Sequence, residues 1–253
     1  PSPVIIAASA SPATVCAGSN SQLDVNYVLP PTNYFVNSIP YAPLPAPATN
    51  AALIATDGWP AGDEGLTAPI NLGFNFSFFG NTYSSVSINS NGHLQFTPSS
   101  TLTTYNPDFP IPDATSFNDP NDFIALGWGD LDQSVGGTIT YGTIGTSPNQ
   151  RFVVQFTSVP FYGSTGSVTS QAILNESDYS IEVHLTQLNT SSFLNRVIGI
   201  ENSTGTVGFA PPGRNTGVWN TTVPEAWQFI PQIPYTFSWT PSATLSTDTI
   251  SNP

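Results

Sequence analysis

Short runs in which apolar and polar side chains alternate limit most strongly how this chain can fold. Alternation places every second side chain on the same face of an extended strand, so that one face can be buried. No window of eleven or more residues shows a helical repeat with caps at its ends. The clearest alternating runs contain Phe74, Phe76 and Phe78; Val86 and Ile88; Phe152, Val154 and Phe156; and Ile181, Val183 and Leu185. Turns rich in Gly and Asn follow about every eight to twelve residues, which predicts an all-β sandwich of two sheets.

The charge balance excludes several classes of partner. The 253 residues include 16 Asp and Glu but only three arginines and no lysine, for a formal net charge of −13. Nucleic-acid binding needs clustered cations and is excluded, and docking on an anionic membrane is disfavoured. No apolar run approaches the roughly 20 residues of a membrane span, so membrane insertion is not expected. Abundant Phe, Tyr, Trp, Gly and Pro with few helix formers are typical of a secreted or cell-surface all-β protein.

Composition divides the chain into four segments. Residues 1–28 contain two short strand patterns, and residues 29–50 are rich in proline, which predicts an extended edge or a linker. Residues 51–231 form a strand-rich block that is long enough for a single core. Residues 232–253 contain one strand pattern and an irregular tail. The two end segments are too short to fold alone, so we expect strands of neighbouring repeats or subunits to complete them.

The lone cysteine, Cys16, has three interpretations. It is a buried small hydrophobe, it bonds to another chain, or it pairs with a segment outside this sequence. Its apolar neighbours Val15 and Ala17 favour the buried thiol. Catalytic use is disfavoured because an activated thiolate needs a nearby His or cation.

Four aspartates in the strand-rich block form a candidate metal site. Asp130 and Asp132 would share one face if their strand continued, and Asp119 and Asp122 lie just upstream. Such a cluster suits Ca²⁺, which takes six to eight oxygen ligands, or acid–base chemistry on a glycoside. The spacing does not match a D-x-D-x-D-G calcium loop, so solvated strand-end carboxylates are the favoured interpretation.

A second candidate site surrounds a tryptophan in the segment DGWPAGDEG. Asp57 and Asp63 flank Trp59 there, followed by Glu64. An exposed tryptophan beside carboxylates can stack on a sugar ring, which predicts a ligand-binding site. The alternative, that Trp59 only covers a sheet edge, is the more common use of such a residue.

The histidines and arginines indicate structural roles. We expect His93 to be a solvated residue after an Asn-Gly hairpin turn, and His184 to lie beside Glu182 on a polar outer face. A zinc site needs three or four protein ligands, and neither histidine has a second histidine nearby in the sequence, so a zinc site is not expected. No G-x-S-x-G nucleophile motif is present. Arg214 is expected to form an ion pair with a carboxylate such as Glu225.

Longer motifs resemble nidogen-like domains. The segment INLGFNFSFFGNTYSSVSINSNGHLQF (residues 70–96) has their aromatic strand, F-F-G-x-x-Y and a later N-G turn. The segments DFIALGWGDLDQSVGGTITYGTIGTSPNQRFVVQF and RVIGIENSTGT are similar to the middle and the closing strands. Aromatic side chains bury about 150–250 Å² each, so we expect the FNFSFF strand and Trp128 to anchor the core between the sheets.

The resemblance also implies a biological setting. The span from NSIPYAPLP to PEAWQFIP is similar to a version found in large repetitive adhesin-like surface proteins of gliding bacteria, which use type IX export. The flanking SPATVCAGSNSQL and YTFSWTP segments resemble pieces of immunoglobulin-like repeats.

These observations favour a structural or adhesive module of a cell-surface or extracellular fibre, without enzymatic activity. Its expected partners are neighbouring copies, joined by strand addition at the termini, and surface glycans. The alternative is a lectin-like carbohydrate-binding module that depends on calcium. No other cofactor is expected, and a glycosidase or peptidase is the least favoured hypothesis.

Overall fold

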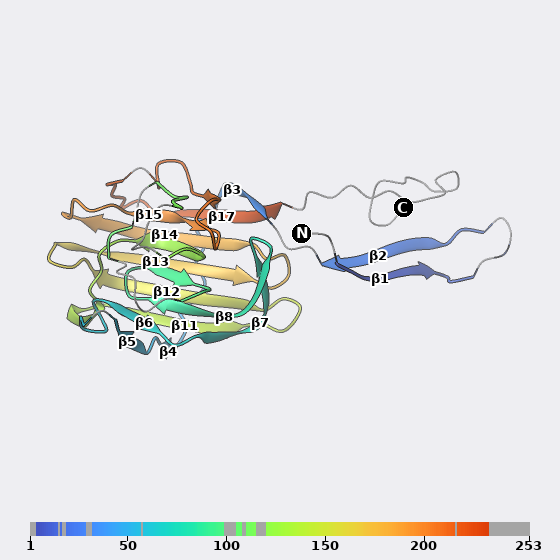
Figure 1. The fold of residues 1–253 in the computed structure, drawn as a ribbon, viewed down its shortest axis with the longest axis horizontal. Coiled ribbons are helices and arrows are strands. Elements are labelled where there is room, and N and C mark those ends of the chain that lie inside the picture. The colour runs from blue at the N-terminus through green and yellow to red at the C-terminus, as the bar shows by residue number, and fades with distance from the viewer. Residues whose placement is uncertain are drawn as a thin grey trace.

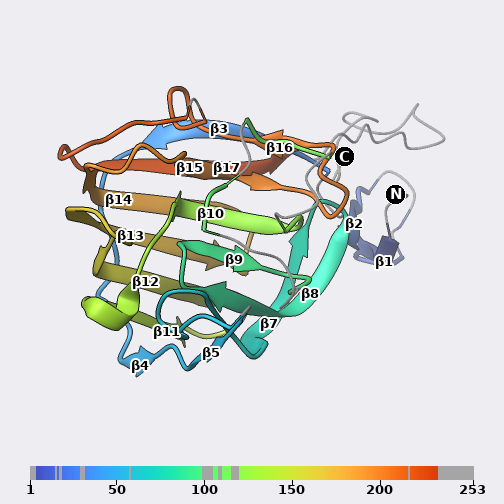
Figure 2. The same cartoon turned by 60° about the vertical axis from the view of Figure 1, so that its left-hand side comes forward.

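The computed structural model describes residues 4–14, 16, 19–28, 32–56, 58–98, 105–107, 110–114, 120–215 and 217–232. In these residues strands dominate, and the one short helix is the 3₁₀ turn η1 (Gln133–Val135). Two antiparallel sheets face each other (Figures 1 and 2), so the predicted all-β sandwich is confirmed. No helix in the described part is long and apolar enough to cross a membrane.

The two sheets of the sandwich contain seven and eight strands. The seven-stranded sheet has the order β3 (Asn33–Ile39), β17 (Glu225–Gln232), β14 (Ile181–Thr190), β13 (Gly166–Asn175), β12 (Arg151–Pro160), β11 (Thr138–Ile144) and β4 (Thr49–Asn50). The eight-stranded sheet has the order β16 (Gly208–Phe209), β15 (Val197–Glu201), β10 (Phe123–Trp128), β9 (His93–Gln95), β8 (Asn81–Asn89), β6 (Gly65–Thr67) and β5 (Leu53–Ala55), and β7 (Ile70–Phe78) pairs with β8.

The core between the sheets consists of the side chains that the alternation predicted. Phe76 and Phe78 on β7 are fully buried, and the Phe76 ring stacks on Phe96 with 6.0 Å between centroids. Facing them from the seven-stranded sheet are Phe152, Val154, Ile181 and Val183, all in the same cluster. Burial of these apolar faces is the main favourable term that holds the sandwich together.

A second, smaller apolar cluster lies on the outer face of the eight-stranded sheet. Phe123, Ala125 and Trp128 point away from the inter-sheet core, and Ile111 from a neighbouring loop covers them. The prediction that Trp128 anchors the core between the sheets is therefore wrong, because β10 buries both of its faces. The predicted solvation of His93 is also wrong: its ring is fully buried and its centroid lies 4.1 Å from that of Trp128.

The proline-rich segment spans the outer face of the seven-stranded sheet. It leaves the edge strand β3 and reaches β4 at the opposite edge (Figure 2). The Leu44 amide donates to Gln171 Oε1 at 2.8 Å, and the Ala42 amide donates to His184 Nδ1 at 3.4 Å. His184 also pairs with Glu182 at 3.0 Å as expected, but it is buried, because residues 40–48 cover the predicted polar face. The strands of the sandwich thus begin at Asn33, upstream of the boundary predicted at residue 51.

The N-terminal segment forms a hairpin of its own. Strands β1 (Val4–Ser11) and β2 (Gln22–Val28) pair with each other and with no third described strand. Cys16 lies in the connecting loop with an exposed side chain, so the buried-thiol interpretation is wrong. Its bonding to another chain or segment stays a prediction. The predicted C-terminal strand falls in residues 233–253, outside the described residues.

The arginines behave differently from one another. Arg214 forms a bidentate ion pair with Glu225, with Nε–Oε1 and Nη2–Oε2 distances of 2.6 and 2.5 Å, which confirms the predicted pair. Its guanidinium also lies 4.6 Å from the ring centroid of Trp219, a cation–π contact. Arg196 is fully buried and donates to the Ser192 carbonyl instead of a carboxylate.

Candidate functional site

Three loops meet at one end of the sandwich and form the candidate site. The first is the turn between β5 and β6, which contains Trp59, Asp63 and Glu64. The second follows β10 and contains Asp130, and the third is the β12–β13 turn with Tyr162. The Tyr162 amide donates to the Asp130 carbonyl at 2.9 Å, which fixes the second loop to the third.

The Trp59–Glu64 turn is held by backbone hydrogen bonds. The Asp63 and Glu64 amides both donate to the Pro60 carbonyl, at 3.0 and 2.9 Å. Ser90 Oγ donates to the Asp63 carbonyl at 2.5 Å, which ties the turn to the end of β8. The turn therefore presents its two carboxylates from a fixed backbone.

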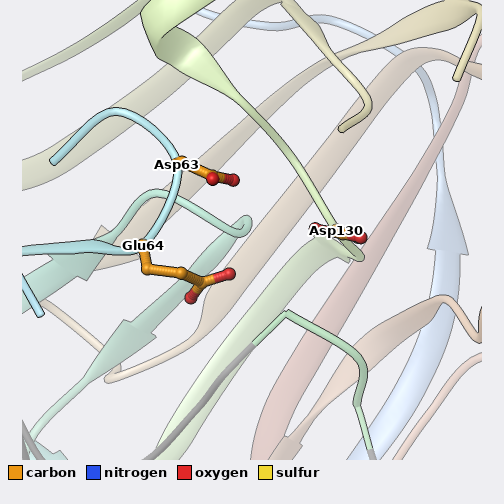
Figure 3. A group of neighbouring side chains, drawn as sticks. All are labelled: Asp63, Glu64 and Asp130. Atoms are coloured by element: carbon orange, nitrogen blue, oxygen red, sulfur yellow. The ribbon is translucent and has the colours of Figure 1, made fainter. Parts of the chain in front are cut away.

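The carboxylates of Asp63, Glu64 and Asp130 converge, with one oxygen from each lying within 4.8 Å of the others (Figure 3). The side chain of Asn91 holds two of the loops in this arrangement by hydrogen bonds. Its buried Nδ2 donates to Glu64 Oε2 at 3.0 Å, and its Oδ1 accepts the Leu131 amide at 2.8 Å. One side chain thus positions both the first and the second loop.

Asn91 belongs to the Asn-Gly turn that the sequence predicted between two strands. The turn joins β8 to β9, and Gly92 adopts a φ of +87°. A Cβ at Gly92 would lie 3.0 Å from the Gly127 carbonyl oxygen, so glycine is needed for both the backbone angle and the close approach. The sequence signal identified the turn, but the role of the Asn91 side chain was missed.

Aromatic rings surround the three carboxylates. A pocket of about 220 Å³ is lined by the carboxylates together with Trp59 and Tyr162 from these loops, and with Tyr105 from a separate described segment, residues 105–107. The three rings are 50, 44 and 44% exposed, and Trp59 and Tyr162 meet edge to face with centroids 6.3 Å apart. An acidic floor with half-exposed aromatic walls offers both hydrogen-bond acceptors and flat apolar surfaces.

Burial and mutual repulsion perturb the acidic groups. Burial, followed by the charges of Asp63 and Asp132, raises the pKa of Asp130 to about 7. Burial and the charge of Asp132 also raise the pKa of Asp63. Both shifts show that these carboxylates are poorly hydrated and lie close to one another, with no described cation to offset their repulsion.

The structure merges parts of the two predicted sites. Asp130 from the metal prediction and Trp59 and Asp63 from the sugar prediction line the same pocket. Asp132 does not share a strand face with Asp130, because β10 ends at Trp128. Instead, Asp132 caps η1 by accepting from the Ser134 amide at 2.9 Å.

The other predicted ligands lie elsewhere. Asp122 and Asp130 lie beyond opposite ends of β10, whose 6 residues span about 20 Å. Asp122 is buried and accepts from Tyr83 Oη at 2.7 Å and Thr97 Oγ1 at 3.1 Å, so its membership of one cluster with Asp130 is wrong. Asp57 and Asp119 lie outside the described residues. Tyr162 carried no signal in the sequence, because a turn tyrosine indicates nothing about which loops lie beside it.

Comparison with known proteins gives one match. No curated protein and no solved structure matches the chain. The family model described as NIDO related matches residues 34–241, which contain both sheets of the sandwich and the pocket. That span is most of the 253 residues, so the chain belongs to the nidogen-related domain family.

Proposed function

We propose that this chain is a non-catalytic adhesive module of an extracellular protein and that it holds a carbohydrate in the pocket of Trp59, Tyr105 and Tyr162. The observation that carries the proposal is the combination of half-exposed rings and carboxylates at one concave site. Membership of the nidogen-related family and a composition rich in strand and turn residues support an extracellular setting. Display on a bacterial surface after type IX export belongs to this proposal.

A carbohydrate suits the pocket better than an apolar or an anionic ligand. Sugar rings have a C–H face that packs on aromatic side chains and hydroxyl groups that donate to carboxylates. The carboxylates of Asp63, Glu64 and Asp130 would repel an anion. Because Trp59 and Tyr162 stand on turns that backbone hydrogen bonds hold in place, these two rings need little ordering on binding.

Replacing Trp59 with alanine should weaken glycan binding at least tenfold, about 1.4 kcal/mol. The removed ring contributes an exposed stacking surface, so the fold should be unaffected. A glycan array with the intact chain identifies the ligand. Titration calorimetry then compares the affinity of the Trp59→Ala variant with that of the intact chain. Phe35→Ala is the matched control, because Phe35 is a similarly exposed aromatic (58%) on β3 that does not line the pocket. If the intact chain bound no glycan on a broad array, the proposal would be overturned.

A structural role in a fibre is supported by a separate observation, the β1–β2 hairpin. The outer edges of both strands pair with no other described strand. An isolated two-stranded hairpin is marginally stable in water, and open strand edges accept further strands. The hairpin can therefore join neighbouring copies by strand addition.

We expect the intact chain to form oligomers whose mass increases with concentration, and a chain lacking residues 1–31 to remain monomeric. The sandwich core draws its strands from Asn33 onward, so the shorter chain keeps that core. Light scattering coupled to size exclusion measures both masses. A monomeric intact chain at all concentrations would contradict assembly through the hairpin.

A further inference from the structure

The three carboxylates at the floor of the pocket form an arrangement that ordinary structural roles do not explain. Strand-end aspartates usually cap backbone amides, as Asp132 does for η1. Asp63 and Asp130 form no hydrogen bond or ion pair with their side chains among the described residues. Their oxygens instead lie within 4.8 Å of each other and of Glu64.

Asp63 provides a separate indication of a ligand. The residue is only 5% exposed, and its carboxylate points toward Asp130 (Figure 3). Burial removes much of the hydration of this carboxylate and no described donor replaces it, which is costly unless a cation or a proton compensates. No lysine exists in the chain, and neither described ion pair involves Asp63 or Asp130.

We propose that Asp63, Glu64 and Asp130 bind a calcium ion at the floor of the pocket. Three carboxylates offer up to six oxygens, and Ca²⁺ accepts six to eight in an irregular geometry, with water supplying the rest. The described ligands include no nitrogen or sulfur, which disfavours zinc and copper. Mg²⁺ demands a near-ideal octahedron and is the weaker candidate.

The second layer of the site holds these ligands in place. Asn91 fixes Glu64, Ser90 fixes the Asp63 backbone, and the Tyr162 amide fixes the Asp130 backbone. Partners of this kind orient the groups that bind a metal and strengthen its binding. The ion would neutralise part of the negative charge beneath the aromatic rings. This inference stands apart from carbohydrate binding, because calcium binding is measured on the protein alone.

Calcium binding can be measured in two ways on the intact chain. Titration calorimetry should give one Ca²⁺ per chain with a dissociation constant on the order of 10⁻⁴ to 10⁻³ M, the range of extracellular modules. In 10 mM Ca²⁺ the melting temperature should rise by about 3–10 °C relative to protein in chelator. Tb³⁺, which replaces Ca²⁺ at oxygen sites, should luminesce on excitation of nearby Trp59, and Ca²⁺ should compete it away.

Variants locate the ion. Asp63→Asn and Asp130→Asn should each weaken Ca²⁺ binding at least tenfold, and melting in chelator shows whether they fold. Asp178→Asn is the control, because this exposed aspartate lies in the β13–β14 turn and asparagine preserves its bond to the Ser180 amide. Trp59→Phe should keep Ca²⁺ affinity and reduce Tb³⁺ luminescence. This variant reports whether the ion lies near residue 59 without changing any of the three carboxylates. The inference is overturned if 10 mM Ca²⁺ produces neither heat nor a melting shift, or if binding survives both aspartate substitutions.

Discussion

Replacing Phe78 with alanine should lower the free energy of unfolding by about 3–5 kcal/mol. The ring is fully buried, and its centroid lies 4.7 Å from those of Phe79 and Phe96. It also lies 6.1 Å from Tyr34, which belongs to the edge strand of the opposite sheet. The substitution would therefore open a cavity where the two sheets meet. Urea unfolding followed by tryptophan fluorescence measures the change.

Two further variants test whether the loss comes from burial. Phe78→Leu keeps much of the volume and should cost less than half as much as the alanine change. Phe35→Ala removes a ring that is 58% exposed and should change stability by no more than about 0.5 kcal/mol. Equal losses at Phe35 and Phe78 would show that the core does not lie between these sheets.

Acidification should destabilise the protein through His93, by about 2–3 kcal/mol between pH 7 and pH 4.5. Burial lowers the pKa of His93 to about 3, whereas an unfolded histidine titrates near 6.5. Below pH 6.5 His93 therefore binds a proton in the unfolded chain but stays neutral in the folded chain. The stabilisation is complete above pH 6.5 and is lost progressively as the pH falls toward 3.

The comparison with His93→Gln isolates this contribution. Glutamine cannot take up a proton, so the variant should lose about 2–3 kcal/mol less than the natural chain over the same pH interval. The raised pKa values of Asp63, Asp122 and Asp130 act in the opposite direction, but they are common to both proteins and cancel. Unfolding curves in chelator at several pH values provide the measurement. If the free energy of unfolding fell by the same amount with pH in both proteins, burial of the His93 ring would be contradicted.

Local patterns were enough to predict the fold class and two side-chain pairs, His184–Glu182 and Arg214–Glu225. Alternation assigned the inner faces of β7, β12 and β14 correctly, because a side-chain period of two is a property of any extended strand. The Asn-Gly turn between β8 and β9 followed from the backbone angles that glycine permits. The Arg214–Glu225 pair followed from the scarcity of cations in an acidic chain.

Predictions failed where a covering segment decides the environment. Alternation indicates that a strand has two faces, but it does not indicate whether the outer face meets water or another part of the chain. His93 and Trp128 are buried on the outer face of one sheet, beside Ile111. His184 is buried on the outer face of the other sheet, beneath residues 40–48.

The candidate site shows the same division. The order of residues sets which side chains are available: carboxylates at strand ends, a tryptophan in a turn, and no lysine to neutralise the carboxylates. The packing of the loops brings Asp63 and Glu64 close to Asp130 and leaves Asp122 apart from them. Hydrogen-bonded pairing of strands far apart in the chain fixes which loops share an end of the sandwich, and the two ends of one strand are held apart by its length.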